Sequence, residues 1–248
     1  RCGLWTYTRT LSAPEEWASQ RLILEFEAVY RSAHVYVNGQ LAGQREHGYT
    51  RFFVPLHDLL EYGQDNTITV ETAAGRDSRW YSGAGIIRPV HLLSSGLVHI
   101  DSAGPRVTTL NADDELASLE IEVPLLNETA GRRPVRVSVT VTDADGQAVA
   151  AADAPITLLP DERATVRLRV HLPRPRRWNL DDPYLYRVTV QAIGPEVRDA
   201  ASCNFGIRTI SVDPVRGFRL NGREVTMRGA CIHHDNGILG ATTFPAAE

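Results

Sequence analysis

The feature that most constrains the fold is a succession of short alternating segments separated by turn signals. Residues 135–141 (VRVSVTV) alternate strictly, a pattern that buries one face of a strand and leaves the other in water. Asn38-Gly39 and Asn221-Gly222 carry the strongest short hairpin signal, because both central positions of a type I′ turn require a positive φ. The sequence therefore predicts a mainly β protein built from antiparallel sheets.

The first hundred residues predict a β-sandwich of the jelly-roll type. Segments 21–30, 34–37 and 67–71 are typical of strands bounded by turns. Segment 86–92 predicts a further strand, in which Pro89 indicates an edge position or a bulge. The large core and rim side chains of this sandwich are expected to be Trp5, Trp17, Tyr30, Tyr36, Phe52 and Phe53.

A second series of strands begins near residue 98. The expected strands are 116–125, 135–142, 164–171 and 184–193, with turns at 127–128, 143–146 and 160–162. About a hundred residues of this kind predict an immunoglobulin-like sandwich. Asn127-Glu128-Thr129 fits an N-glycosylation sequon, although such triplets are frequent by chance.

Composition limits the classes of function. The 248 residues are 43% hydrophobic and 23% charged, which is typical of globular proteins, and the net charge of −4 argues against nucleic acid or an anionic membrane as the main partner. No apolar run approaches the 18 or so residues of a membrane span. Cys2, Cys203 and Cys231 are far apart, so neither a disulfide framework nor a zinc site is predicted. Both termini look like cuts, which leaves the localisation open.

Two polar clusters are candidate sites. Asp77, Arg79, Trp80 and Tyr81 place a carboxylate, a guanidinium and two aromatic rings together, as a sugar site requires, but a structural corner with a surface Arg–Asp pair fits equally well. The other cluster follows a short apolar run, 228–232, that could be a buried strand.

That second cluster is His233-His234-Asp235-Asn236. In a barrel, substrates bind at the carboxyl ends of the strands, so the cluster predicts the edge of an active site. A metal site is disfavoured, because adjacent residues on a strand point to opposite faces and three in a row cannot converge on one ion.

Four segments in order, 79–90, 178–186, 205–208 and 217–240, resemble the signature segments of glycoside hydrolase family 2. Segments 35–39 and 48–50 are similar to the jelly-roll domain of that family. The family includes β-galactosidases, β-glucuronidases and β-mannosidases. The form of residues 231–240 (CIHHDNGILG) most resembles the β-galactosidase-like members.

The resemblance implies three domains. Residues 1–97 would be a sugar-binding jelly roll that lacks its first strands, residues 98–210 an immunoglobulin-like sandwich, and residues 211–248 the truncated start of a (β/α)₈ barrel with 229–233 as its first strand. A complete barrel takes about 250 residues. A first barrel strand without neighbours would expose Val225, Met227, Cys231 and Ile232.

The resemblance further implies the N-terminal portion of a retaining exo-β-glycosidase, most similar to a β-galactosidase. A β-glucuronidase, a β-mannosidase or a non-catalytic carbohydrate-binding module are the alternatives. Such a mechanism needs two glutamates on later barrel strands. Glu224 and Glu248 do not match them, so this chain alone is expected to be inactive.

The binding residues implied by the resemblance come from both clusters. His233 would bind galactose hydroxyls, Asp77 and Arg79 would reach toward the barrel mouth, and His234 and Asp235 would orient their loop or touch substrate. No cofactor or metal is expected in this chain, while magnesium and sodium would bind to the full-length enzyme. The expected partner is a carbohydrate substrate, with a homo-oligomer as an open alternative.

Overall fold

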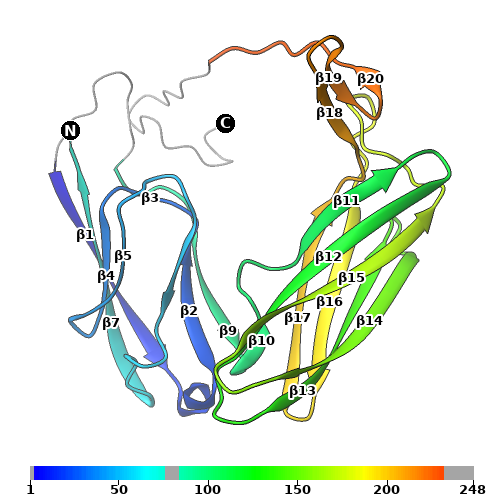
Figure 1. Ribbon diagram of the computed structural model, residues 1–248. Helices are drawn as coiled ribbons and strands as arrows, with labels where there is room; N and C mark the ends of the chain where they lie inside the picture. The colour runs from blue at the N-terminus through cyan, green and yellow to red at the C-terminus, as the bar shows by residue number, and fades with distance from the viewer. Residues whose placement is uncertain (1–2, 76–83, 232–248) are drawn as a thin grey trace. The chain divides into compact units, whose positions relative to one another are not determined.

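The described residues are almost entirely β-structure. A computed structural model describes residues 3–75 and 84–231, in which the strands run from β1 (Gly3–Ala13) to β20 (Arg223–Glu224) (Figure 1). The single helix among them is the 3₁₀ helix η1 (Glu15–Ser19). None of the described segments forms a helix that is long and apolar enough to cross a membrane. The prediction of a mainly β protein is therefore confirmed.

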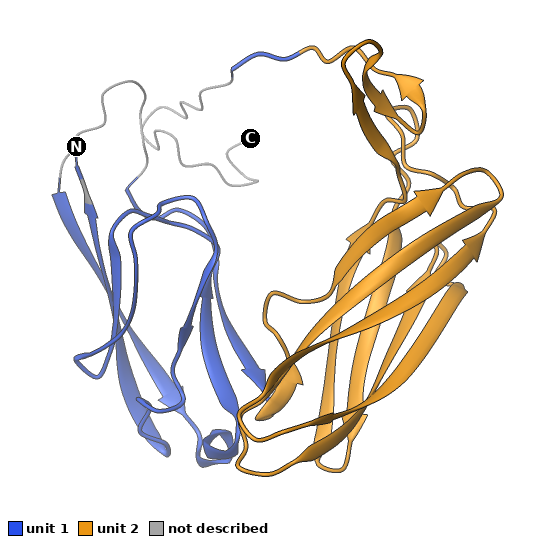
Figure 2. Ribbon diagram, viewed as in Figure 1, with its two compact units in different colours: residues 1–95, 229–248 blue, residues 96–228 orange. Residues whose placement is uncertain are grey.

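The chain divides into two compact units, shown in blue and orange in Figure 2. Unit 1 comprises residues 1–95 with 229–248, and unit 2 comprises residues 96–228. Each unit has its own cluster of buried apolar side chains, and no residue belongs to both clusters. The two units are therefore two separate hydrophobic cores on one chain.

Unit 1 is a sandwich of two antiparallel sheets. One sheet has the order β1-β7-β4-β5, with β7 (Gln64–Ala74), β4 (Ala33–Val37) and β5 (Gln40–Arg45). The other sheet has the order β6-β2-β9, with β6 (Phe52–Pro55), β2 (Arg21–Phe26) and β9 (Val90–Ser95). A short ladder joins β3 (Val29–Tyr30) to β8 (Gly85–Ile86). Side chains of both sheets, among them Val35, Val70 and Phe26, form one buried cluster between the layers.

The Asn38-Gly39 turn of unit 1 confirms the hairpin prediction. Asn38 and Gly39 have φ values of 50° and 80° and join β4 to β5. The Asn38 amide donates to the Leu59 carbonyl at 3.2 Å and to Oδ1 of the buried Asn66 at 2.8 Å, while its own Oδ1 accepts from the Thr67 amide at 2.9 Å. One turn side chain thus fixes three segments of the chain.

The predicted large side chains of unit 1 are unequally buried. Tyr30 and Phe52 are buried, at 6% and 8% exposure. The other four, Trp5, Trp17, Tyr36 and Phe53, are half-buried and occupy the rim of the sandwich.

Unit 2 is a second antiparallel sandwich, as the alternation of residues 135–141 predicts. In one sheet β12 (Leu116–Asn127) pairs with β10 (Val98–Ile100), β11 (Arg106–Ala112) and β15 (Arg163–Pro173). The other sheet has the order β14-β13-β16-β17, with β14 (Ala148–Leu158), β13 (Arg133–Thr142), β16 (Tyr186–Gly194) and β17 (Val197–Phe205). Val137, Val139 and Val141 of β13 are buried with Ile121 of β12 in the core of this unit.

A small three-stranded sheet follows, made of β18 (Ile210–Asp213), β19 (Gly217–Leu220) and β20. Asn221 and Gly222 have φ values of 50° and 77°, so the second predicted Asn-Gly turn is also confirmed. Residues 225–231 lie outside any strand and Met227 is 70% exposed.

The sequence predicts a buried strand at 228–232 and a first barrel strand at 229–233. The described residues of these ranges, 228–231, form no strand, so neither prediction is confirmed. No described strand pairs with this segment. The predicted exposure of Met227 and Cys231 is observed, Val225 is half-buried, and Ile232 lies outside the described residues.

Candidate functional site

The five residues expected from the sequence to bind substrate all lie outside the described residues. Asp77 and Arg79 belong to segment 76–83, and His233, His234 and Asp235 belong to segment 232–248.

The flanks of segment 76–83 are anchored at one end of the unit 1 sandwich. Tyr30 pairs with Gly85 in the β3–β8 ladder, and the Ala73 amide donates to the Arg31 carbonyl at 3.0 Å. Gly85 has a φ of 94°, and a Cβ there would lie 1.9 Å from the hydroxyl of Tyr7. Only glycine fits this close approach, so the base of the segment is fixed beside Tyr30 and Arg31.

A loop next to this ladder carries an exposed aromatic ring. The Tyr49 side chain is 52% exposed, and its ring centroid lies 5.0 Å from that of the buried Tyr30 and 6.4 Å from that of His47. The guanidinium of Arg31, the residue that follows β3, lies 5.8 Å from the centroid of the Tyr30 ring. This corner brings aromatic, imidazole and guanidinium groups together, and the sequence did not predict it.

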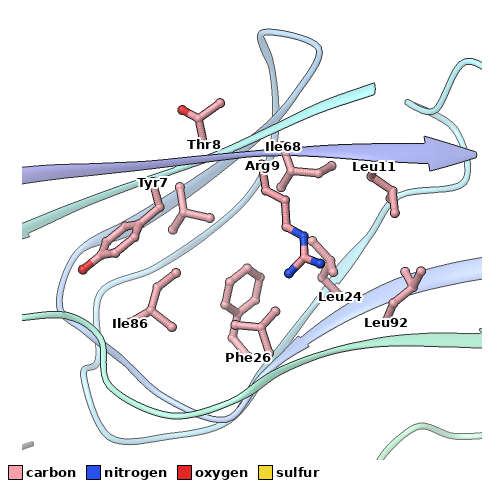
Figure 3. A pocket seen from close by; sticks show the side chains of 11 residues that line it. Tyr7, Thr8, Arg9, Leu11, Leu24, Phe26, Ile68, Ile86 and Leu92 are labelled. Carbon is pink, nitrogen blue, oxygen red and sulfur yellow. The ribbon is translucent and has the colours of Figure 1, made fainter. Parts of the chain in front are cut away.

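A cavity of about 490 Å³ opens between the edge strands β1 and β9 of unit 1 (Figure 3). Tyr7, Arg9 and Leu11 point into it from β1, and Phe26 lies at its floor (Figure 3). Most of its walls are aliphatic, whereas a sugar site needs hydrogen-bonding groups for many hydroxyls. The inward charge of Arg9 on an edge strand is a device that discourages pairing with other chains. The cavity therefore does not have the chemistry of a sugar site.

In unit 2, side chains of residues 176–186 form a cluster of a guanidinium, a carboxylate and two aromatic rings. Arg176 donates two hydrogen bonds to Asp182, of 2.7 and 2.9 Å, and its Cζ lies 4.3 Å from the Tyr184 ring centroid. The hydrogen bonds lower the pKa of Asp182 and raise the pKa of Arg176. The Tyr186 hydroxyl accepts from the Arg176 amide at 2.9 Å, and burial raises its pKa. These contacts stabilise the loop and leave its carboxylate ionised.

The β18–β20 hairpin is attached to this loop through Asn221. Its amide Nδ2 donates to the Trp178 carbonyl at 2.9 Å, and its Oδ1 accepts from the Thr209 amide at 3.0 Å. Trp178 also packs against Gly206, where a Cβ would come within 2.8 Å, and lies under Arg208, whose Cζ is 5.2 Å from the ring. Asn221 thus connects the last described sheet to the loop that carries Trp178.

We expect Asn221→Ala to loosen this hairpin. The substitution removes both side-chain hydrogen bonds and forces alanine into a positive φ, a combined cost of about 2–3 kcal/mol. Amide exchange of β18 and β19, followed by mass spectrometry, should accelerate by a factor of roughly 30 or more. Asn221→Gly is the matched control, because it retains the turn conformation and loses only the hydrogen bonds. An alanine variant that exchanges at the parent rate would contradict this role.

Several of the described carboxylates are engaged in surface ion pairs. Glu122 lies between Arg106 and Arg167 at 2.9 and 3.0 Å, and Glu25 pairs with Arg51 at 3.0 Å. Backbone amides lower the pKa of Asp113 and Asp213. A general acid needs a raised pKa, so Asp113 and Asp213 have the opposite chemistry.

The described residues contain no group of three His, Cys, Asp or Glu side chains that could hold a metal ion. The thiols of Cys203 and Cys231 are free, and burial raises the pKa of Cys203.

The described residues form two antiparallel β-sandwiches in tandem, which defines the class of fold. Two family models specify the class. The model of the glycosyl hydrolase 2 galactose-binding domain-like family matches residues 3–80, and that of the glycosyl hydrolases family 2 matches residues 98–208. The chain belongs to glycosyl hydrolases family 2.

Similar proteins support this assignment. The chain is 34% identical over 242 residues to beta-galactosidase BoGH2A of Bacteroides ovatus, covering 96% of the chain and 28% of that protein. It is 29% identical over 262 residues to a beta-glucuronidase of Bacteroides fragilis, covering 98% and 37%. A crystal structure of a family 2 member from Bacteroides cellulosilyticus superposes with a TM-score of 0.93 at 30% identity, covering 99% of the chain and 34% of that structure. The chain thus spans about a third of the length of these relatives.

Proposed function

We propose that the longer protein to which this chain corresponds is a retaining exo-β-glycosidase that hydrolyses terminal β-D-galactosides. The choice of a galactoside as substrate is supported by the 34% identity with beta-galactosidase BoGH2A over nearly the whole chain. The proposal assigns the two catalytic glutamates to a barrel that residues 211–248 begin. The relatives named beta-glucuronidase make a glucuronide the second candidate substrate.

The geometry of the described residues supports an accessory role for this chain. A retaining mechanism needs two carboxyl groups about 5 Å apart, one with a raised pKa that protonates the leaving oxygen. The described carboxylates with a shifted pKa are shifted downward and lie on the surface. Within the proposal, His233, Asp77 and Arg79 bind the sugar, and His234 and Asp235 orient their loop.

Magnesium and sodium belong to the proposal only as ions of the longer protein. A magnesium site requires several converging oxygen ligands. The described residues bring no such group together, so they do not fit either ion and no step of the reaction is assigned to one.

The test is a substrate panel on the longer protein. Nitrophenyl β-D-galactoside, β-D-glucuronide and β-D-mannoside are each hydrolysed under the same conditions and compared by kcat/KM. The proposal expects the galactoside to be preferred by at least about a hundredfold, since a pocket that hydrogen-bonds the correct substituent discriminates strongly. A preference for the glucuronide would make a glucuronide the proposed substrate in place of a galactoside. If none of the three compounds is hydrolysed, the glycosidase assignment is overturned.

A further inference from the structure

The loop that carries Tyr49 is held at both of its ends. The Ser32 hydroxyl donates to the Glu46 carboxylate at 2.8 Å, and the Ser32 amide reaches the Glu46 carbonyl at 3.4 Å. At the other end Arg45 donates to the Thr50 hydroxyl at 2.8 Å. These contacts fix residues 46–50 against the connection between β3 and β4 and against the end of β5, so the aromatic ring is presented on a preorganised loop.

Glycine 48 lets the loop sit directly on the Tyr30 ring. A Cβ at Gly48 would lie 2.2 Å from the Tyr30 ring, and Tyr30 is buried and cannot retreat. The next residue, Tyr49, therefore rests with one side against Tyr30 while half of its surface remains in water. An exposed aromatic ring with a fixed orientation is informative, because its burial would otherwise be favourable.

The neighbours of Tyr49 in the loop are polar. Glu46, His47 and Thr50 are exposed, and together they offer a carboxylate, an imidazole and a hydroxyl. A protein partner of ordinary affinity would need a larger apolar patch around the ring. A single flat ring bordered by hydrogen-bonding groups fits a pyranose, which has one apolar C–H face and hydroxyls around its rim.

We propose that Tyr49 is a carbohydrate-binding platform that stacks on one face of a pyranose, while Glu46, His47 and Thr50 hydrogen-bond its hydroxyl groups. None of these four residues is among the five assigned above to substrate. The Tyr49 proposal rests on the proposed function only in the choice of the sugar used as a probe. The role of the platform is to hold glycan chains against unit 1.

The test is binding of methyl β-D-galactopyranoside to the 248-residue chain, followed by saturation-transfer NMR and titration. Tyr49→Ala should weaken binding about tenfold or more, since it removes the stacking ring and its buried area. Tyr49→Phe should bind within about twofold of the parent, because the ring is retained. Tyr49→Leu keeps apolar contact with Tyr30 but lacks a flat ring, and should weaken binding as alanine does.

The matched control is Leu41→Ala on β5, a residue that is 53% exposed in the same unit. It should leave binding unchanged. Equal binding by the parent and Tyr49→Ala, equal losses in the Tyr49 and Leu41 variants, or no binding by the parent would each overturn the proposal. Binding that depends on Tyr49 without hydrolysis by the longer protein would refute only the proposed function, and hydrolysis without such binding would refute only this inference.

Discussion

Phe26→Ala should lower the free energy of unfolding of unit 1 by about 3–5 kcal/mol. Phe26 is 1% exposed, and its ring stacks on Phe52 with centroids 4.9 Å apart and an interplanar angle of 7°. The substitution removes a buried ring and its aromatic partner contact, and it enlarges the cavity of Figure 3, which Phe26 already lines. Hydrogen exchange in denaturant, read separately for peptides of the two units, measures the loss.

The same experiment tests whether the two cores are independent. Unit 2 should keep its stability in the Phe26→Ala protein, because the two buried clusters share no residue. Phe26→Leu should cost less, about 1 kcal/mol, since it leaves much of the volume filled. Leu41→Ala should change unit 1 by no more than about 0.5 kcal/mol, as expected of an exposed site. An equal loss in both units would contradict two separate cores.

Asn127→Ala should destabilise unit 2 by about 3 kcal/mol, roughly 10 °C in melting temperature. Asn127 is 1% exposed, and its amide donates to the Gly131 and Leu159 carbonyls at 2.8 and 2.7 Å. Its Oδ1 accepts from the Thr129 amide and hydroxyl at 3.1 and 2.7 Å. Alanine removes these four hydrogen bonds of a buried side chain, and differential scanning calorimetry records the effect.

Asn204→Ala is the control for Asn127→Ala, because Asn204 is an asparagine that lies exposed on β17. Its melting temperature should stay within about 2 °C of the parent. The burial of Asn127 also bears on the N-glycosylation sequon at residues 127–129. The Asn127 amide is buried and donates to two carbonyls, so a glycan on it is incompatible with this fold. A stable protein that carries a glycan at Asn127 would contradict the hydrogen-bonding role.

Local pattern was enough to predict the strands that alternate and the turns that need a positive φ. The 135–141 strand and both Asn-Gly turns occur where the sequence indicated them. Pro89 also behaves as expected: β9 is an edge strand, and the predicted 86–92 strand is divided around this proline into β8 and β9.

Elements that depend on long-range pairing were not predicted. β14 is rich in alanine (AVAAADAPITL), a residue with low strand propensity, and it forms only because β13 pairs with it along its length. β1 likewise pairs with β7, more than fifty residues away. The Tyr49 corner depends on Tyr30 packing beneath Gly48, a contact that no local pattern indicates.

The most direct test of the account compares hydrolysis of nitrophenyl β-D-galactoside by the longer protein and by the 248-residue chain at equal molar concentration. We expect turnover by the longer protein and none above buffer by the chain, because the proposal assigns both catalytic glutamates to later strands of the barrel. Turnover by the chain alone would contradict it.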